Sequence, residues 1–136
     1  MTNNQPNAIR HLVGELERLG YWTAEARSDD ENFGDKRILL MKEGLGVRIT
    51  RDRGQWFAEA SGPGLADWFS PMVWMSYLNG RVGDTSTPSL DDQVRLLLEN
   101  LDRIESASYS DPDILATLRT YRSARASQRR TGLSSP

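Results

Sequence analysis

Residues 36–61 read KRILLMKEGLGVRITRDRGQWFAEAS, and this stretch decides the fold. It opens with an apolar run from Ile38 to Met41, which is typical of a central strand. Residues 47–50 then alternate between apolar and polar side chains, the period of a strand with one buried face. Arg53-Gly54 forms a tight turn into residues 55–61, so the last two segments have the form of a hairpin.

The residues before this stretch add one strand and one helix. Residues 21–27 read YWTAEAR and place the side chains of Trp22, Ala24 and Ala26 on one face of a strand. Four strands joined by short connections predict an antiparallel meander with helices over one of its faces. The segment from about residue 6 to 19 is predicted to be helical, because its apolar residues recur at spacings of three and four: Ile9, Leu12, Val13, Leu16 and Leu19.

Three more helices are predicted after the sheet. Their starts are marked by Ser70 before Pro71, by Ser89 three residues before Asp92, and by Asp111 before Pro112. The last apolar stripe ends at Tyr121. We therefore expect an α+β fold with an N-terminal helix, a four-stranded antiparallel sheet (a meander) and three C-terminal helices. Residues 1–122 would form a single globular domain, and residues 123–136 a frayed or disordered basic tail.

Composition excludes several classes of protein. The 136 residues carry a net charge of −2, whereas a nucleic-acid binder normally has a basic surplus. No apolar stretch approaches the roughly 20 residues of a membrane span, and residues 1–6 (MTNNQP) do not form a signal peptide. There is no cysteine, which excludes disulfides and a cysteine nucleophile. We therefore expect a cytoplasmic protein with neither nucleic acid nor membrane as its partner.

The chain carries little catalytic or metal-binding chemistry. His11 is its only histidine, and there is no Gly-x-Ser-x-Gly motif for a hydrolase nucleophile. A calcium loop starting at Asp29 would place Phe33 and Leu40 where oxygen ligands are required. We therefore predict that the protein is not an enzyme and has no catalytic residue, cofactor or metal site.

Aromatic residues are concentrated in one part of the chain. Six of the eleven lie in the 22 residues from Trp56 to Tyr77. Most of them are expected in a small core between the hairpin and the short helix that follows. Trp68 is the exception, because it lies in a loop between Asp67 and the cap at Ser70, where an exposed indole would anchor an interface.

An acidic stretch lies downstream of the aromatic residues. Between residues 84 and 105, six acids stand against two arginines. A solvated outer helix face is the simpler interpretation, and an acidic surface that captures a basic partner is the functional one. The acids of this stretch that we predict to take part in binding are Asp91, Asp92, Glu99 and Asp102.

A basic stripe follows near the C-terminus. Arg119, Arg122, Arg125 and Arg129 recur at spacings of three and four, and Arg130 adds to them. Such a stripe can bind phosphates, as in nucleic acids. We favour a solvated helix end, which the helix dipole stabilises.

Three segments resemble one family of proteins. WFAEASGPG at residues 56–64, DWFSP at 67–71 with Trp74 and Tyr77-Leu78 after it, and SLDDQ at 89–93 are similar to small actinobacterial immunity proteins of polymorphic toxin systems. The resemblance covers about residues 47–105. It implies a cytoplasmic, non-catalytic protein that binds and blocks one cognate toxin.

These observations predict a protein-binding module. Its partner would be another protein, such as a toxin domain, and the chain itself would be a monomer or a homodimer. Trp68 and Asp67 would lie at the centre of the interface, with the four acids around them. The alternatives are a homodimeric secretion chaperone that binds a disordered export substrate, a small-ligand-binding protein, and an enzyme that uses carboxylates alone.

Overall fold

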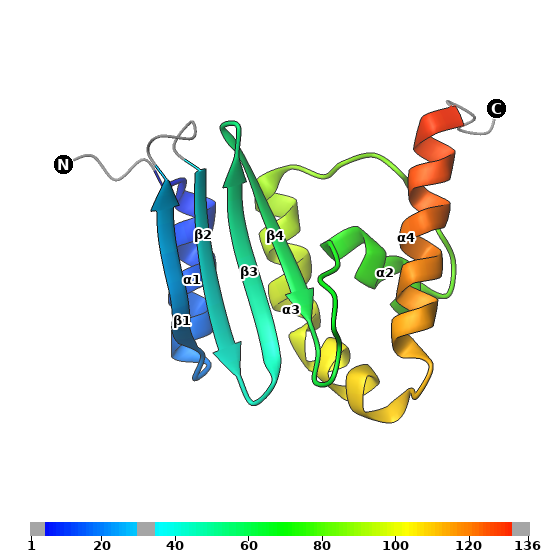
Figure 1. Ribbon diagram of the computed structural model, residues 1–136, viewed down its shortest axis with the longest axis horizontal. Helices are drawn as coiled ribbons and strands as arrows, with labels where there is room; N and C mark the ends of the chain where they lie inside the picture. Colours follow the sequence, from blue (N-terminus) through cyan, green and yellow to red (C-terminus); the bar gives the residue numbers. More distant parts are fainter. Residues whose placement is uncertain (1–4, 30–34, 132–136) are drawn as a thin grey trace.

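A computed structural model describes residues 5–29 and 35–131 (Figure 1). The chain forms a helix, a four-stranded sheet and then three helices, which confirms the predicted α+β fold. The elements are α1 (Asn7–Arg18), β1 (Trp22–Asp29), β2 (Asp35–Lys42), β3 (Leu45–Asp52), β4 (Gln55–Ser61), α2 (Pro71–Asn79), α3 (Leu90–Ser110) and α4 (Ile114–Thr131).

The sheet is an antiparallel meander in the order β1-β2-β3-β4. Two-residue turns join β2 to β3 and β3 to β4. Both residues of each turn have positive φ: 50° at Glu43, 85° at Gly44, 52° at Arg53 and 81° at Gly54. Turns with two positive φ angles match the twist of the strands that they connect, which explains why the strands pair directly with their neighbours.

Helices α1 and α3 lie against one face of the sheet (Figure 1). The hydroxyl oxygen of Ser89 caps α3 by accepting a hydrogen bond from the amide of Asp92 at 3.2 Å, as the sequence predicted. The two helices bury their apolar stripes, and the sheet supplies the alternate residues of its inner strands. The buried apolar side chains of the sheet are Leu40, Leu45, Val47, Ile49, Ala58 and Ala60.

Helices α2 and α4 lie beside β4, and the free edge of β4 is closed by side chains and by one short bridge. Ala60 and Phe69 exchange two backbone hydrogen bonds, and the Trp74 indole donates to the Ala60 carbonyl at 3.0 Å. The side-chain oxygen of Gln93 accepts a hydrogen bond from the Ala58 amide at 3.3 Å. Phe69 and Trp74 are fully buried in an edge-to-face pair, so they form the small aromatic core expected there.

The C-terminal segment differs from the prediction. Helix α4 continues to Thr131, whereas the sequence predicted a frayed tail from residue 123. Arg125 accounts for the difference, because only 7% of it is exposed and its Nη1 donates to the carbonyls of Val82 (3.4 Å) and Asp84 (2.5 Å). The expectation of a solvated arginine stripe is therefore wrong at Arg125. Residues 132–136 lie outside the described residues.

Candidate functional site

One face of the sheet has no described helix over it (Figure 1). Successive strand residues point to opposite sides, so the neighbours of the core residues point to this second side. Gly46 and Ser61 lie on this side and are buried, and we call its exposed or partly exposed residues the uncovered face. They are Trp22, Glu25 and Arg27 of β1, Arg37, Leu39 and Met41 of β2, Arg48 and Thr50 of β3, and Phe57 and Glu59 of β4.

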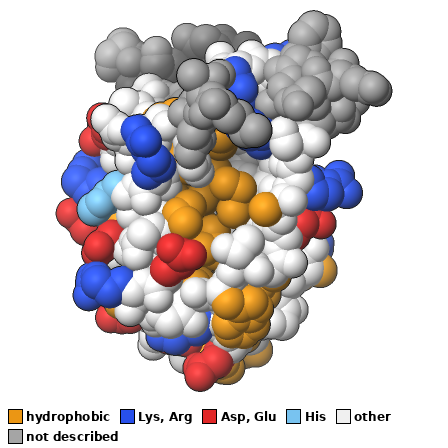
Figure 2. Space-filling view, turned by 90° about the vertical axis from the view of Figure 1, so that its left-hand side faces the viewer, with side chains coloured by type: hydrophobic (Ala, Val, Ile, Leu, Met, Phe, Trp, Pro, Cys, Tyr) orange, Lys and Arg blue, Asp and Glu red, His pale blue; other side chains and the backbone are white. Residues whose placement is uncertain are grey.

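The uncovered face is apolar and aromatic at the start of β1. Trp22 is 55% exposed and lies opposite Met41 in the strand register. Leu19, just before β1, is another exposed large apolar residue. Figure 2 looks onto the β1 side of the molecule and shows hydrophobic side chains gathered there. Single exposed apolar residues are normal, whereas large contiguous apolar patches are typical of interaction surfaces.

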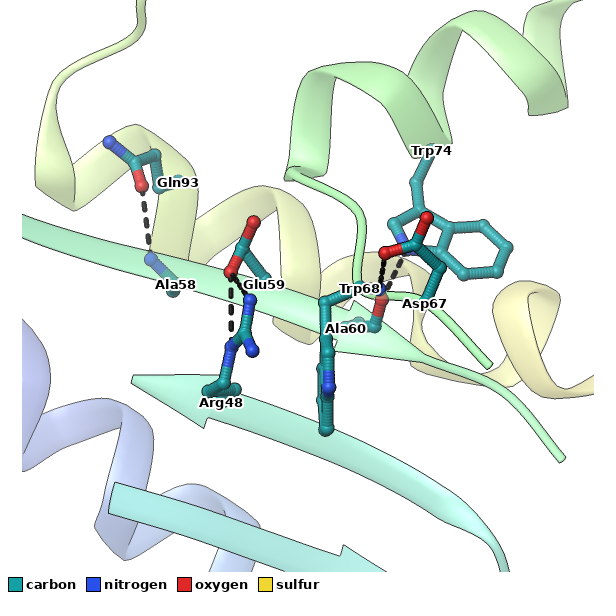
Figure 3. Close-up of polar contacts among 8 residues, drawn as sticks. All are labelled: Arg48, Ala58, Glu59, Ala60, Asp67, Trp68, Trp74 and Gln93. Carbon is teal, nitrogen blue, oxygen red and sulfur yellow. Dashed lines mark hydrogen bonds and ion pairs between the residues drawn. The ribbon is translucent and has the colours of Figure 1, made fainter. Parts of the chain in front are cut away.

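Trp68 borders this face and packs on β3. A Cβ added to Gly46 would lie 2.7 Å from Cη2 of Trp68, so the indole occupies the space that the glycine leaves. The guanidinium of Arg48 lies 5.0 Å from the Trp68 ring centroid, a cation–π distance. Arg48 also donates to Glu59 at 2.6 Å across the two strands (Figure 3). Trp68 is therefore half-buried and held in place, with the rest of its surface exposed to solvent.

Asp67 attaches the same loop to α4. Its carboxylate lies 2.8 Å from the Arg122 guanidinium and 3.5 Å from that of Arg119, and it accepts a hydrogen bond from the Trp68 amide. The hydrogen bond from Arg122 is the largest cause of a lowered pKa for Asp67. Asp67 thus lies next to Trp68, as predicted, but it is paired within the protein.

The four acids predicted to surround Trp68 lie elsewhere. Asp91, Asp92, Glu99 and Asp102 are exposed on α3, which covers the opposite face of the sheet. Two of them are paired with one arginine, because Arg95 lies 3.3 Å from Asp92 and 3.3 Å from Glu99. The structure therefore brings Trp68 and Asp67 together and does not place the acids around them.

Two of these acids line a groove between α1 and α3. The groove has a volume of about 650 Å³, and Asp91 and Glu99 share it with His11 and Glu15. Apolar side chains such as Leu98 also line it. The sequence offered no sign that His11 would lie beside these acids, because 80 residues or more separate them along the chain.

The described carboxylates with shifted pKa values all shift downward. Hydrogen bonds are the largest cause in each case, to Glu15 from Arg18, to Asp84 from the Ser86 amide, and to Asp111 from the Tyr77 hydroxyl. A carboxylate that acts as a general acid needs a raised pKa instead. Among the described residues, no three histidine or acidic side chains converge as a metal site would require. No helix in this part of the chain has the length and apolarity to cross a membrane.

The sequence did not predict that the residues of the uncovered face would form one exposed surface. The alternation of Arg48 and Thr50 with buried neighbours was recognised, and the register pairs Arg48 with Glu59. The pattern placed Val47 and Ile49 on the covered side of the sheet, but it did not show that the other side would have no described helix over it. Comparisons of the chain with protein-family models, curated proteins and solved structures found no match.

Proposed function

We propose that the chain is a non-catalytic, cytoplasmic protein-binding module that docks a partner protein on the uncovered face. We further propose that it acts as an immunity protein and that the partner is a toxin domain, which docking would block. The observation that carries the binding proposal is the exposed indole of Trp22 on a sheet face with no described helix over it.

The side chains on this face are those that contribute most to binding energy. Tryptophan, arginine, methionine and phenylalanine are enriched at the centres of interfaces. Trp22, Met41, Arg48 and Phe57 belong to the uncovered face, and Trp68 packs at its border. Arg48 is already held by Glu59 and by the Trp68 ring, so a partner would lose little free energy in ordering it.

The test is affinity capture from a native lysate, with Trp22→Glu as the variant and Tyr109→Glu as its matched control. Tyr109 is 67% exposed on α3, away from the uncovered face, so both changes place a charge at an exposed aromatic position. We expect one stoichiometric partner that Trp22→Glu loses and Tyr109→Glu retains. The captured protein is then purified, and its toxicity is measured with and without this chain.

The outcomes separate the parts of the proposal. A partner that both variants retain would show that the uncovered face is not the docking surface. A partner without toxic activity would refute the immunity role and leave the binding module in place. Light scattering adds a further outcome, because a dimer that Trp22→Glu dissociates would mean that a second copy occupies the face.

The second candidate function is a secretion chaperone. The outer edge of β1 pairs with no strand in the described part of the chain, whereas the edge of β4 is closed. An extended substrate could add a strand there. A register shift between Thr23 and Glu25 interrupts this edge, and bulges of this kind discourage strand addition. A chaperone of this type should be a homodimer, so a firmly monomeric protein in light scattering would refute it.

A further inference from the structure

A second cavity lies between α2 and α4, with a volume of about 250 Å³. Arg122, Arg125 and Arg129, on successive turns of α4, border it. The cap residue Ser70 and the first turn of α2 also contribute to its lining. None of its lining residues is a carboxylate, although the chain as a whole is acidic.

Arg125 is a buried cation at this cavity. Its Nη1 donates to two backbone carbonyls, and it forms no ion pair with a carboxylate in the described residues. Burial lowers the pKa of Arg125 and the charge of Arg129 lowers it further, whereas the charge of Asp84 offsets part of this shift. Because no described carboxylate contacts the buried guanidinium directly, an anion in the cavity close to Arg125 would be stabilised there.

Arg129 adds positive charge at the same place, and Arg122 presents a guanidinium whose charge Asp67 already compensates. Arg122 pairs with Asp67 at 2.8 Å, and its guanidinium lies 4.9 Å from the Phe69 ring centroid. Arg129 is exposed and makes no ion pair within the described residues. The positive end of the α2 dipole adds to the potential at this cavity.

We propose that this cavity binds a phosphate-sized oxyanion, either free or as the monoester of a small apolar group. Arginine is the side chain best suited to phosphate, because its planar donors match the oxygens in pairs. The volume corresponds to about eight water molecules, below the roughly 300 Å³ at which drug-sized pockets begin. Phe57, Met72 and Val73 give the cavity an apolar side that an ester group would contact.

This site does not depend on the proposed partner protein. It lies beside β4 between α2 and α4, and only Phe57 is shared with the uncovered face. Failure of one proposal therefore leaves the other unaffected.

The experiment is thermal unfolding of the full chain in sodium phosphate, with sodium chloride at equal ionic strength as the reference. We expect a rise in Tm that follows the logarithm of phosphate concentration once that concentration exceeds Kd, because a ligand of the folded state at concentration L stabilises it by RT ln(1 + L/Kd). Phenyl phosphate should give the same rise in Tm at a lower concentration than inorganic phosphate. These two probes distinguish a free oxyanion from a monoester.

Two glutamine variants test the location. Arg129→Gln removes an exposed charge at the cavity, and we expect about a tenfold loss of phosphate affinity. Arg119→Gln removes the same charge from the same helix outside the cavity, and it should bind phosphate like the parent protein. Neither residue is buried, so both variants should fold.

Two results would overturn the proposed oxyanion site, and one would overturn its apolar part. Phosphate also stabilises proteins generally through exclusion from their surfaces, but that rise in Tm is proportional to the phosphate concentration and does not depend on any single arginine. A rise of that kind, or equal affinity for the Arg129→Gln and Arg119→Gln variants, would overturn the site. Equal affinity for the two probes would overturn the apolar part of the assignment.

Discussion

The guanidinium of Arg48 lies 5.0 Å from the centre of the Trp68 ring, and this contact joins the loop before α2 to the uncovered face. The two residues approach because Gly46, two positions before Arg48 on the same strand face, has no side chain. Glu59 holds Arg48 from the neighbouring strand at 2.6 Å. Trp68 thus has a structural role in addition to any role in binding.

Replacing Gly46 with alanine should displace Trp68. The new Cβ would meet Cη2 of the indole at 2.7 Å and the sulfur of Met41 at 3.0 Å. Overpacking of this kind costs about 1–3 kcal/mol in the free energy of unfolding, measurable by urea denaturation. Gly14→Ala is the control, because nothing lies within 4 Å of its new Cβ and alanine favours the α1 helix. A Gly46→Ala protein as stable as the parent would contradict the Trp68 packing.

Replacing Gln93 with leucine should leave the edge of β4 unsatisfied. The Ala58 amide would lose its side-chain acceptor, and an unpaired buried donor costs about 1–3 kcal/mol. Amide hydrogen exchange gives the specific signal. The Ala58 amide should exchange faster than in the parent protein, whereas the exchange rate of inner-strand amides such as that of Ile49 should change only as much as the overall unfolding free energy does. Unchanged protection at Ala58 would show that Gln93 does not close this edge.

Replacing Arg125 with alanine should fray the end of α4. The change removes the donor to the Val82 and Asp84 carbonyls and the packing of the buried side chain. We expect a loss of helical signal in circular dichroism and a fall of about 1–3 kcal/mol in unfolding free energy. The exposed Arg129→Ala variant should change stability by less than about 0.5 kcal/mol. Equal effects of the two substitutions would argue against Arg125 as the attachment point.

The Asp67 pairing should make stability depend on pH at the acidic end. The pKa of Asp67 is lowered in the folded state, so the unfolded chain takes up its proton first as pH falls. The stabilisation is therefore complete above the unfolded pKa of about 3.9 and disappears as pH drops through the lower folded pKa. Asp67→Asn should cost less than about 1 kcal/mol near pH 7, since the pair is partly exposed.

The comparison with Asp67→Asn is best made by urea denaturation at several pH values. The difference in unfolding free energy between the parent and the variant should shrink toward zero as the solution is acidified. A difference that stays constant with pH would mean that Asp67 acts through packing and not through its charge.

Several elements were predictable because their signals are local. The alternation through residues 47–50 and the turn at Arg53-Gly54 predicted a hairpin that the structure confirms. Ser89 was recognised as a helix cap from its own neighbours. The end of α4 was not predictable in this way, because Arg125 is held by carbonyls more than 40 residues away along the chain.

The candidate site was predicted only in part. Trp68 and Asp67 are adjacent in sequence and remain adjacent in the structure. The acids of α3 were expected around them, but a helix can cover either face of a sheet, and α3 lies on the face opposite the uncovered one. Trp22 was predicted to share a strand face with Ala24 and Ala26, and this was wrong. The register shift between Thr23 and Glu25 places Trp22 opposite Met41 on the uncovered face and Ala26 opposite Ile38 on the other face.

The sequence alone therefore determined the kinds of elements and their order, because hydrogen-bond periodicity, capping and turn geometry act between near neighbours in the chain. The tertiary structure decided which helices cover the apolar face of the sheet, that Trp68 packs over Gly46, and that Arg125 is buried beside other arginines. These features depend on contacts between segments far apart in the chain, where the side that a helix occupies is set by the packing of the whole core.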